Sequence, residues 1–240
     1  VTLHGSRSLP PKWGVTLPDV LSRWGVDVET PAGFERLRAA ADVTGFLFVP
    51  AESGCPALER VRDIRTQLGL RTLFNSAEKL LRYSEAPYLA FGIFHGTVVE
   101  RMADLIPRLG CRKAIIVQGS EGSEDVPVTR RSRLYVVHDG KAEPVTVDPA
   151  AYGMHHETEP GGEGWSADRQ AETAAAVLRG DAPDVFTDMT VLNSGIRLWL
   201  AGAAATVEAG MDLARGALTS GKANEKFLQW LRSAGGRLPA

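Results

Sequence analysis

Apolar residues along this chain follow two patterns, short continuous runs and positions spaced three or four residues apart. Short runs bounded by Gly or Pro are typical of strands buried on both faces, whereas the wider spacing is typical of amphipathic helices. Strands are predicted at 45–50, 88–94 and 114–117. Residues 3–11 are predicted to be the end of a further strand followed by an irregular loop. Helices are predicted at 17–24, 31–41, 57–68, 77–82, 98–109, 167–178, 190–203, 206–218 and 222–231.

Local signals support several of these boundaries. Thr16 and Asp19 have the spacing of a capping box, and Thr30 precedes a proline that suits the first turn of a helix. Thr97 is the predicted cap of the helix that follows the strand at 88–94. Small residues at 51–55 and the aperiodic stretch 151–164 predict loops, the second of them mobile.

The order of elements predicts an α/β fold. Strand, helix and strand between 88 and 117 form a βαβ unit, so these strands are expected to be parallel. Alternating residues at 133–137 and 143–147 flank Asp139-Gly140, the signature of a β-hairpin. We therefore expect a mostly parallel central sheet flanked by helices, with a β-hairpin excursion and a helical C-terminus.

Composition narrows the class of protein. With 44% hydrophobic and 23% charged residues, the 25.8-kDa chain resembles an ordinary globular protein. A net charge of −2 gives no overall footprint for nucleic acid, and only Arg130, Arg131 and Arg133 form a concentrated basic run. Cys55 and Cys111 lie far apart in the sequence, which suits a reducing compartment. The sequence has no apolar run near 20 residues and no signal-peptide pattern at its start, so we expect a cytoplasmic protein.

Adjacent carboxylates follow the strand at 114–117. Gln118 to Ser123 supplies the glycines and serines of a sharp turn, and Glu124 and Asp125 come next. Ligands of open α/β sheets bind outside the carboxyl ends of strands, so this pair could hold a divalent metal with a phosphorylated substrate. A solvated acidic turn is the alternative.

A second polar turn lies at the start of the chain. His4, Gly5, Ser6 and Arg7 together offer a ring nitrogen, a backbone amide, a hydroxyl and a guanidinium, which suits an anion. A surface loop is the alternative. Arg65, three residues after another helical arginine, is by default a structural or solvated residue. His155 and His156 are adjacent and therefore a poor pair of metal ligands.

The order of these motifs resembles the α/β domain of anthranilate phosphoribosyltransferases and their relatives. The family pattern Lys-His-Gly-Asn-Arg is similar to the turn at 4–7, and Leu-Gly-Ile-Arg-Thr-Ile-Phe-Asn is similar to 68–75. Further similarities lie at Gly45–Phe48, Cys55–Leu58, Arg65, Gly119–Asp125 and Ser220–Lys222.

The resemblance implies a fold, a reaction and a set of site residues. It implies a transferase that moves a phosphoribosyl group from 5-phosphoribosyl-1-pyrophosphate to a nitrogen acceptor, as in tryptophan biosynthesis. Glu124 and Asp125 would bind Mg²⁺, and Arg65 would lie beside the acceptor with His4, Gly5 and Ser6, while Arg7 would support the turn. Residues 1–240 would form a single phosphoribosyltransferase-like domain.

Departures from the family pattern predict an acceptor other than anthranilate. Leu3 replaces a lysine, Ser6 an asparagine and Cys55 a histidine. A charged segment from Glu78 to Tyr83 replaces a Gly-Pro-Leu-Asn-Pro turn, and the acidic pair is reversed. An inactive relative that binds nucleic acid or another ligand is the alternative, and a nucleoside phosphorylase relative is a third interpretation.

The chain begins at Val1, without methionine, on residues that resemble a strand end. We therefore expect that it is a fragment, with the family's glycine-rich loop and N-terminal helical domain upstream. In the family that helical domain makes the dimer contact, so a homodimer is expected of the complete protein.

Overall fold

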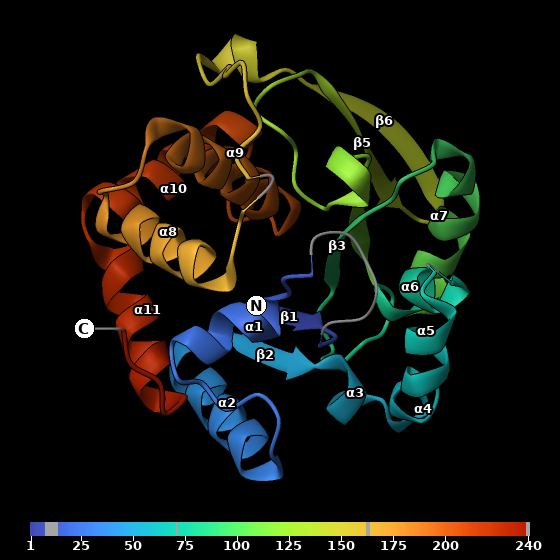
Figure 1. Ribbon diagram of the computed structural model, residues 1–240. Helices are drawn as coiled ribbons and strands as arrows, with labels where there is room; N and C mark the ends of the chain where they lie inside the picture. Colours follow the sequence, from blue (N-terminus) through green and yellow to red (C-terminus); the bar gives the residue numbers. More distant parts are fainter. Residues whose placement is uncertain (8–13, 71, 162–163, 239–240) are drawn as a thin grey trace. The chain divides into compact units, whose positions relative to one another are not determined.

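The computed structural model describes residues 1–7, 14–70, 72–161 and 164–238. It confirms the α/β class, with strands and helices that divide into two compact units. The first unit comprises Val1–Ser84, Glu163–Leu178 and Lys222–Ala240, and the second comprises Glu85–Gly162 and Arg179–Gly221. Figure 1 labels the helices and strands and colours them along the sequence, from blue at the N-terminus to red at the C-terminus.

The first unit contains a two-stranded parallel sheet. β1 (Thr2–Gly5) pairs with β2 (Leu47–Pro50) in a register that sets Gly5 opposite Pro50. The helices of this unit are α1 (Leu17–Arg23), α2 (Pro31–Thr44), α3 (Ala51–Gly54), α4 (Pro56–Arg60), α5 (Arg62–Leu68), α6 (Leu73–Glu78), α8 (Ala167–Arg179) and α11 (Lys222–Ser233). Because the strands are parallel, both carboxyl ends lie at the same edge of the sheet.

Aromatic residues that follow α1 and α2 pack against α11 in the core of the first unit. The rings of Trp24 and Phe227 meet edge to face at 4.8 Å between centroids, and those of Phe46 and Trp230 meet at 5.0 Å. The buried residues of this core include Val20, Leu21, Val26, Val28, Leu37, Ala40, Phe48, Ala171, Leu231 and Ala234. β2 packs against α2 in this core, and the carboxyl end of β2 leads directly into α3.

The second unit contains a four-stranded mixed sheet. Its strands β3 (Tyr88–Gly92), β4 (Lys113–Val117), β5 (Ser132–His138) and β6 (Lys141–Val147) lie in that order. β3 and β4 are parallel, as predicted, and the other two pairings are antiparallel. The remaining elements are η1 (Gly96–Val98), α7 (Val99–Arg108), η2 (Ser120–Gly122), η3 (Pro149–Tyr152), α9 (Asp184–Leu200) and α10 (Val207–Thr219).

Alternate residues of β4 point to opposite faces of this sheet. Ile115 and Val117 belong to a core that includes Leu192 and Ile196 of α9 and Met211 of α10. α7 contacts β4, β5 and β6. The continuous apolar run of β4 is therefore explained by a strand buried on both faces, as the sequence pattern predicted.

Several predicted boundaries are confirmed by local geometry. Thr16 and Asp19 form the capping box of α1, with the Thr16 amide donating to the Asp19 carboxylate at 2.7 Å. The hydroxyl of Thr30 accepts from the Gly33 amide at the start of α2. In the hairpin, Asp139 and Gly140 both have positive φ, 51° and 76°, as the predicted two-residue turn requires.

The prediction of one continuous helix at 57–68 is wrong, because the structure has two shorter helices there. Val61 has a ψ of 2°, so the segment is divided into α4 and α5. Leu58 is buried as expected, but Leu68, which lies beyond the interruption, is 55% exposed. Ile64, Leu70 and Leu73 are also exposed.

Other boundaries also differ from the predictions. The segment predicted as a helix at 77–82 is helical at 73–78, because Thr72 caps α6. The loop predicted at 51–55 contains the short helix α3, Val98 rather than Thr97 precedes α7, and α9 begins at Asp184 rather than at 190. Residues 8–11 and 162–163 of the predicted loops lie outside the described residues.

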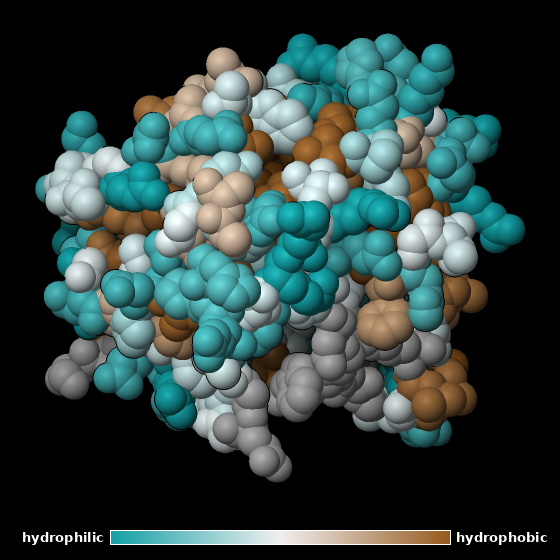
Figure 2. Space-filling view, turned by 90° about the horizontal axis from the view of Figure 1, so that it is seen from above, coloured by the Kyte–Doolittle hydropathy of each residue, from teal (hydrophilic) through white to brown (hydrophobic). Residues whose placement is uncertain are grey.

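Among the described residues, no helix combines the length and the apolar character that crossing a bilayer requires. The face shown in Figure 2 carries hydrophilic residues with smaller apolar patches between them.

Candidate functional site

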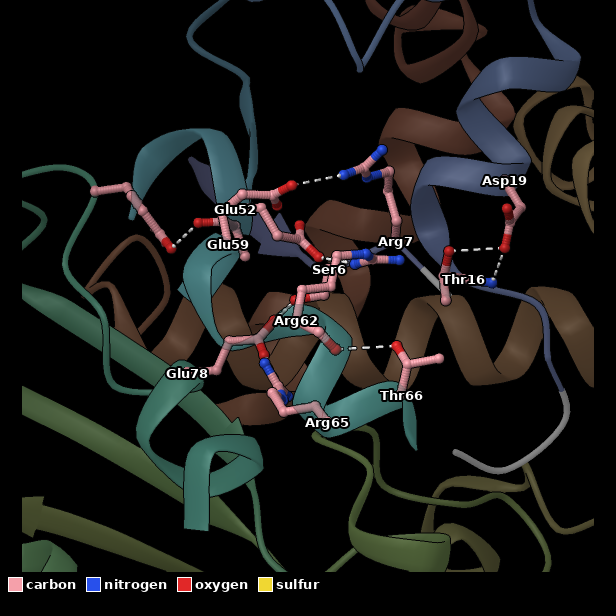
Figure 3. A network of polar contacts seen from close by, with 12 residues as sticks. Ser6, Arg7, Thr16, Asp19, Glu52, Glu59, Arg62, Arg65, Thr66 and Glu78 are labelled. Carbon is pink, nitrogen blue, oxygen red and sulfur yellow. Dashed lines mark hydrogen bonds and ion pairs between the residues drawn. The ribbon is translucent and has the colours of Figure 1, made fainter. Parts of the chain in front are cut away.

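The turn after β1 is part of a network of polar side chains in the first unit (Figure 3). The hydroxyl of Ser6 donates a hydrogen bond to Oε1 of Glu78. Arg65 donates from Nη2 to the other oxygen of the same carboxylate, Oε2, at 3.2 Å. Glu78 thus connects the predicted turn to the predicted helical arginine, although Ser6 and Arg65 lie far apart in the sequence.

The Arg65–Glu78 ion pair is buried. The side chain of Arg65 is 4% exposed and that of Glu78 is 13% exposed. The guanidinium of Arg65 also lies over the ring of Phe74, with 5.9 Å from Cζ to the ring centroid. A buried guanidinium needs a compensating charge, and Glu78 supplies one.

The position of Glu78 follows from the way α6 begins. The side chain of Asn75 accepts a hydrogen bond from the Thr72 amide at 2.8 Å, which completes the capping geometry of the first turn. Glu78 is the last residue of this six-residue helix. The cap at Thr72 therefore determines where the carboxylate reaches the network.

Two further arginine–glutamate pairs flank the first. Arg62 of α5 forms an ion pair with Glu52 of α3, which is 5% exposed. Arg7 lies 3.5 Å from Glu59 of α4, and both of these side chains are exposed to a substantial degree. The network therefore contains three guanidinium groups and three carboxylates in pairs.

His4 lies near Tyr83, with 5.1 Å between ring centroids. The Tyr83 hydroxyl donates to the carbonyl oxygen of Ala51 at 2.9 Å. Burial raises the pKa of Tyr83 above its usual range, and the nearby Cys55 and acidic side chains raise it further. This phenol is therefore protonated at neutral pH and serves as a donor.

The structure thus brings Ser6 and Arg65 together through Glu78, places Arg7 against a different glutamate, and sets His4 beside Tyr83. Sequence reasoning missed the participation of Glu52, Glu59, Glu78 and Tyr83. The sequence identifies the charged segment beginning at Glu78 only as a departure from the family pattern. Its partner could not be read from spacing, because Arg65 lies on another helix.

The acidic pair Glu124–Asp125 belongs to the second unit. Glu124 is exposed, and Asp125 is half-buried and accepts from Nη2 of Arg197 at 2.8 Å. The backbone amide of Asp125 donates to the Ser123 hydroxyl at 3.1 Å. A Cβ added at Gly119 would lie 2.4 Å from the carbonyl oxygens of Ser123 and Asp125, so this tight turn requires glycine.

Asn193 of α9 anchors the end of the same turn. Its side chain accepts from the Val126 amide at 2.8 Å and donates to the Val126 carbonyl at 2.9 Å. Asn193 fixes the backbone just after the acidic pair, and Arg197, which is also on α9, binds the Asp125 side chain. The orientation of the turn is therefore set by α9 as well as by β4.

Within the described residues no cluster of three or more His, Cys, Asp and Glu side chains is arranged to enclose a metal ion. Mg²⁺ often binds through one or two carboxylates plus substrate phosphates and water. The oxygen donors of Glu124 and Asp125 fit that mode of binding, which requires the phosphorylated substrate to complete the coordination.

The basic run has local acidic and polar partners. Arg131 pairs with Asp148 at 2.7 Å, and Arg130 donates to the Ser120 hydroxyl at 3.3 Å. The hydrogen bond from Arg131 keeps the pKa of the Asp148 carboxyl below its usual range. His156, of the predicted mobile loop, lies 2.8 Å from Asp188 of α9.

Comparison with known proteins places this geometry in a wider context. Residues 1–224 match the family model described as the glycosyl transferase family, a/b domain. An anthranilate phosphoribosyltransferase of Azorhizobium caulinodans is 30% identical over 234 residues, which are 97% of this chain and 66% of that protein. The chain thus spans just under two thirds of that relative's length.

Solved structures show the same fold. The crystal structure of anthranilate phosphoribosyltransferase from Thermus thermophilus matches with a TM-score of 0.80 and 27% identity, covering 98% of this chain and 68% of that one. The Saccharomyces cerevisiae enzyme in complex with PRPP and Mg matches with a TM-score of 0.77 and 17% identity, covering 98% and 64%. The resemblance drawn from the sequence motifs is confirmed.

Proposed function

Because this chain belongs to the glycosyl transferase family of a/b domains, we propose that its protein is a phosphoribosyltransferase. It would transfer a phosphoribosyl group from phosphoribosyl pyrophosphate to a nitrogen acceptor other than anthranilate. The observation that carries this proposal is the family match over residues 1–224, which includes both the turn at 4–7 and the acidic turn at 124–125. The anthranilate phosphoribosyltransferases that match the chain support the same reaction class.

Glu124 and Asp125 are the proposed Mg²⁺ ligands. The yeast structure that shares the fold contains PRPP and Mg, which supports the cofactor assignment. When bound, Mg²⁺ would neutralise negative charge on the phosphates of the donor. Arg197 holds the Asp125 carboxylate at 2.8 Å and so orients this side chain before any ligand arrives.

The protein's own contribution to such a reaction is positioning and electrostatic stabilisation. The Asn193 hydrogen bonds to Val126 hold the backbone beside the acidic pair. In the first unit, Ser6 and Arg65 are the proposed acceptor-side residues, with His4 and Gly5 in the same turn and Arg7 supporting it.

Three substitutions support an acceptor different from anthranilate. Ser6 stands where the family pattern has asparagine, Cys55 where it has histidine, and Glu78 begins the segment that replaces a proline-containing turn. Glu78 is bound to both Ser6 and Arg65, so two of the altered residues, Ser6 and Glu78, act on one another. Homodimerisation through a helical domain remains a prediction from the resemblance.

Isothermal titration calorimetry with phosphoribosyl pyrophosphate, with and without Mg²⁺, tests the proposed function. We expect micromolar binding that requires Mg²⁺ and that is lost in the double variant Glu124→Gln/Asp125→Asn. The matched control is Asp181→Asn/Asp212→Asn, which removes the same charge from exposed carboxylates paired with arginines in the same unit. Equal binding by the double variant and by the wild type would refute the metal assignment.

The experiment needs the protein with any residues that precede Val1 in its natural form, because the chain covers only part of its relatives. If the folded natural protein does not bind phosphoribosyl pyrophosphate when the ligand is present at millimolar concentration, the proposed function is wrong.

A further inference from the structure

We propose that Glu78 is an acceptor-specificity residue that occupies the place of an acceptor carboxylate at Arg65. The acceptor would then be a neutral or cationic nitrogen compound rather than an acid. This inference rests on the proposed function, which puts Ser6 and Arg65 on the acceptor side. It adds the chemical class of the acceptor and the residue that selects it.

The first observation is that Arg65 already has a carboxylate partner within the protein. Its Nη2 lies 3.2 Å from Oε2 of Glu78, and the guanidinium is 4% exposed. An incoming carboxylate could pair with Arg65 only by displacing Glu78. The displaced Glu78 would then be a second negative charge close to the acceptor, which disfavours an acidic ligand.

The second observation is that Ser6 holds the other oxygen of Glu78. The Ser6 hydroxyl donates to Oε1, so both oxygens of the carboxylate are bound. A carboxylate with two partners is fixed in position, and displacing it means breaking a hydrogen bond as well as an ion pair. Ser6, which stands where the family has asparagine, thus holds Glu78, which begins the segment that replaces the family's turn.

The third observation concerns the charge around this pair. Arg62 and Arg7 are paired with Glu52 and Glu59, so the three arginines of the network face three carboxylates. These six groups sum to zero net charge. The polar contacts among these side chains are drawn in Figure 3. The six groups therefore supply no excess positive charge that would attract an acid, whereas a neutral amine or amide would leave every pair intact.

Two matched probes test the proposal. Anthranilate (2-aminobenzoate) and 2-aminobenzamide have the same ring and amine and differ mainly in the charge of the ortho group. Their dissociation constants are measured by calorimetry, with and without phosphoribosyl pyrophosphate and Mg²⁺. We expect the wild type to bind the amide at least tenfold more tightly than the acid.

The variant Glu78→Gln removes the charge and keeps the size of the side chain. It should improve anthranilate binding relative to 2-aminobenzamide by at least tenfold, because Arg65 then lacks its carboxylate partner. The double variant Arg65→Gln/Glu78→Gln should lose that gain. The matched control Glu35→Gln removes a carboxylate that pairs with an arginine of α2 outside the network, and it should leave the ratio unchanged.

The outcomes separate this inference from the function on which it rests. A change in the acid-to-amide ratio in Glu78→Gln supports the specificity role even if phosphoribosyl pyrophosphate does not bind, in which case only the proposed reaction fails. An unchanged ratio, no binding of either probe to Glu78→Gln, or an equal gain in Glu35→Gln overturns the inference.

Thermal unfolding of each variant shows whether it is folded. If Glu78→Gln does not fold, the wild-type ratio decides the inference: tighter binding of anthranilate than of 2-aminobenzamide, or no binding of either, overturns it.

Discussion

Replacing Arg65 by methionine removes one partner of a buried ion pair and leaves the Glu78 carboxylate, 13% exposed, with the Ser6 hydrogen bond. Replacing Glu78 by glutamine instead leaves a guanidinium that is 4% exposed. Breaking a buried pair by removing one partner destabilises a protein by about 3–5 kcal/mol, because the remaining charge is desolvated without compensation. We expect each single variant to lose stability in that range.

The double variant Arg65→Met/Glu78→Gln removes both charges. Residues in direct contact show coupling energies of about 0.5–3 kcal/mol, and the burial of this pair places the expectation in the upper half, about 2–3 kcal/mol. The double variant should therefore be more stable than the sum of the two single losses predicts. The free energy of unfolding is measured by urea denaturation followed by tryptophan fluorescence, for all four members of the cycle.

An exposed pair provides the matched comparison. Glu35 and Arg38 of α2 lie 3.7 Å apart with side chains that are 70% and 62% exposed. Pairs of this kind contribute about 0–1 kcal/mol, so their cycle should give a small coupling energy. If the Arg65–Glu78 coupling is no larger than that of Glu35–Arg38, Glu78 does not compensate the charge of Arg65, and the reasoning about acceptor charge fails with it.

Three further predictions concern single residues. Asn193→Ala should cost about 2–5 kcal/mol in urea unfolding, because two buried backbone groups lose their partner, and a loss below about 0.5 kcal/mol would contradict this. Gly210→Ala should destabilise by about 1–3 kcal/mol, because a Cβ would lie 2.4 Å from a carbonyl oxygen of α9, and an increased melting temperature would refute that close contact. The hydrogen bond from the Thr30 hydroxyl is the main cause of a lowered pKa at Asp27. The ionised Asp27 therefore stabilises the folded protein above about pH 4, and this contribution is lost as the pH falls through the lowered pKa. In Thr30→Val an NMR titration should show this pKa moving up toward 3.8, and no shift would exclude that cause.

Much of the fold followed from local patterns in the sequence. The apolar run of β4, the capping box of α1 and the Asp139-Gly140 turn depend on neighbouring residues only, and each was predicted. The break in the predicted helix at 57–68 was not predicted, because the residues on both sides of Val61 suit a helix. Likewise, α6 begins at a cap whose second member is Asn75, a weaker signal than the usual acidic residue.

The sequence by itself determined the family, the fold class and the candidate residues, because motifs and periodicity are local and their order along the chain is preserved. Only the tertiary structure decided which charges meet. Glu78 binds both Ser6 and Arg65, and Arg197 binds Asp125, although each partner lies on a different element. Ion pairs of this kind depend on how helices and strands pack in three dimensions, and spacing along the chain does not encode that packing.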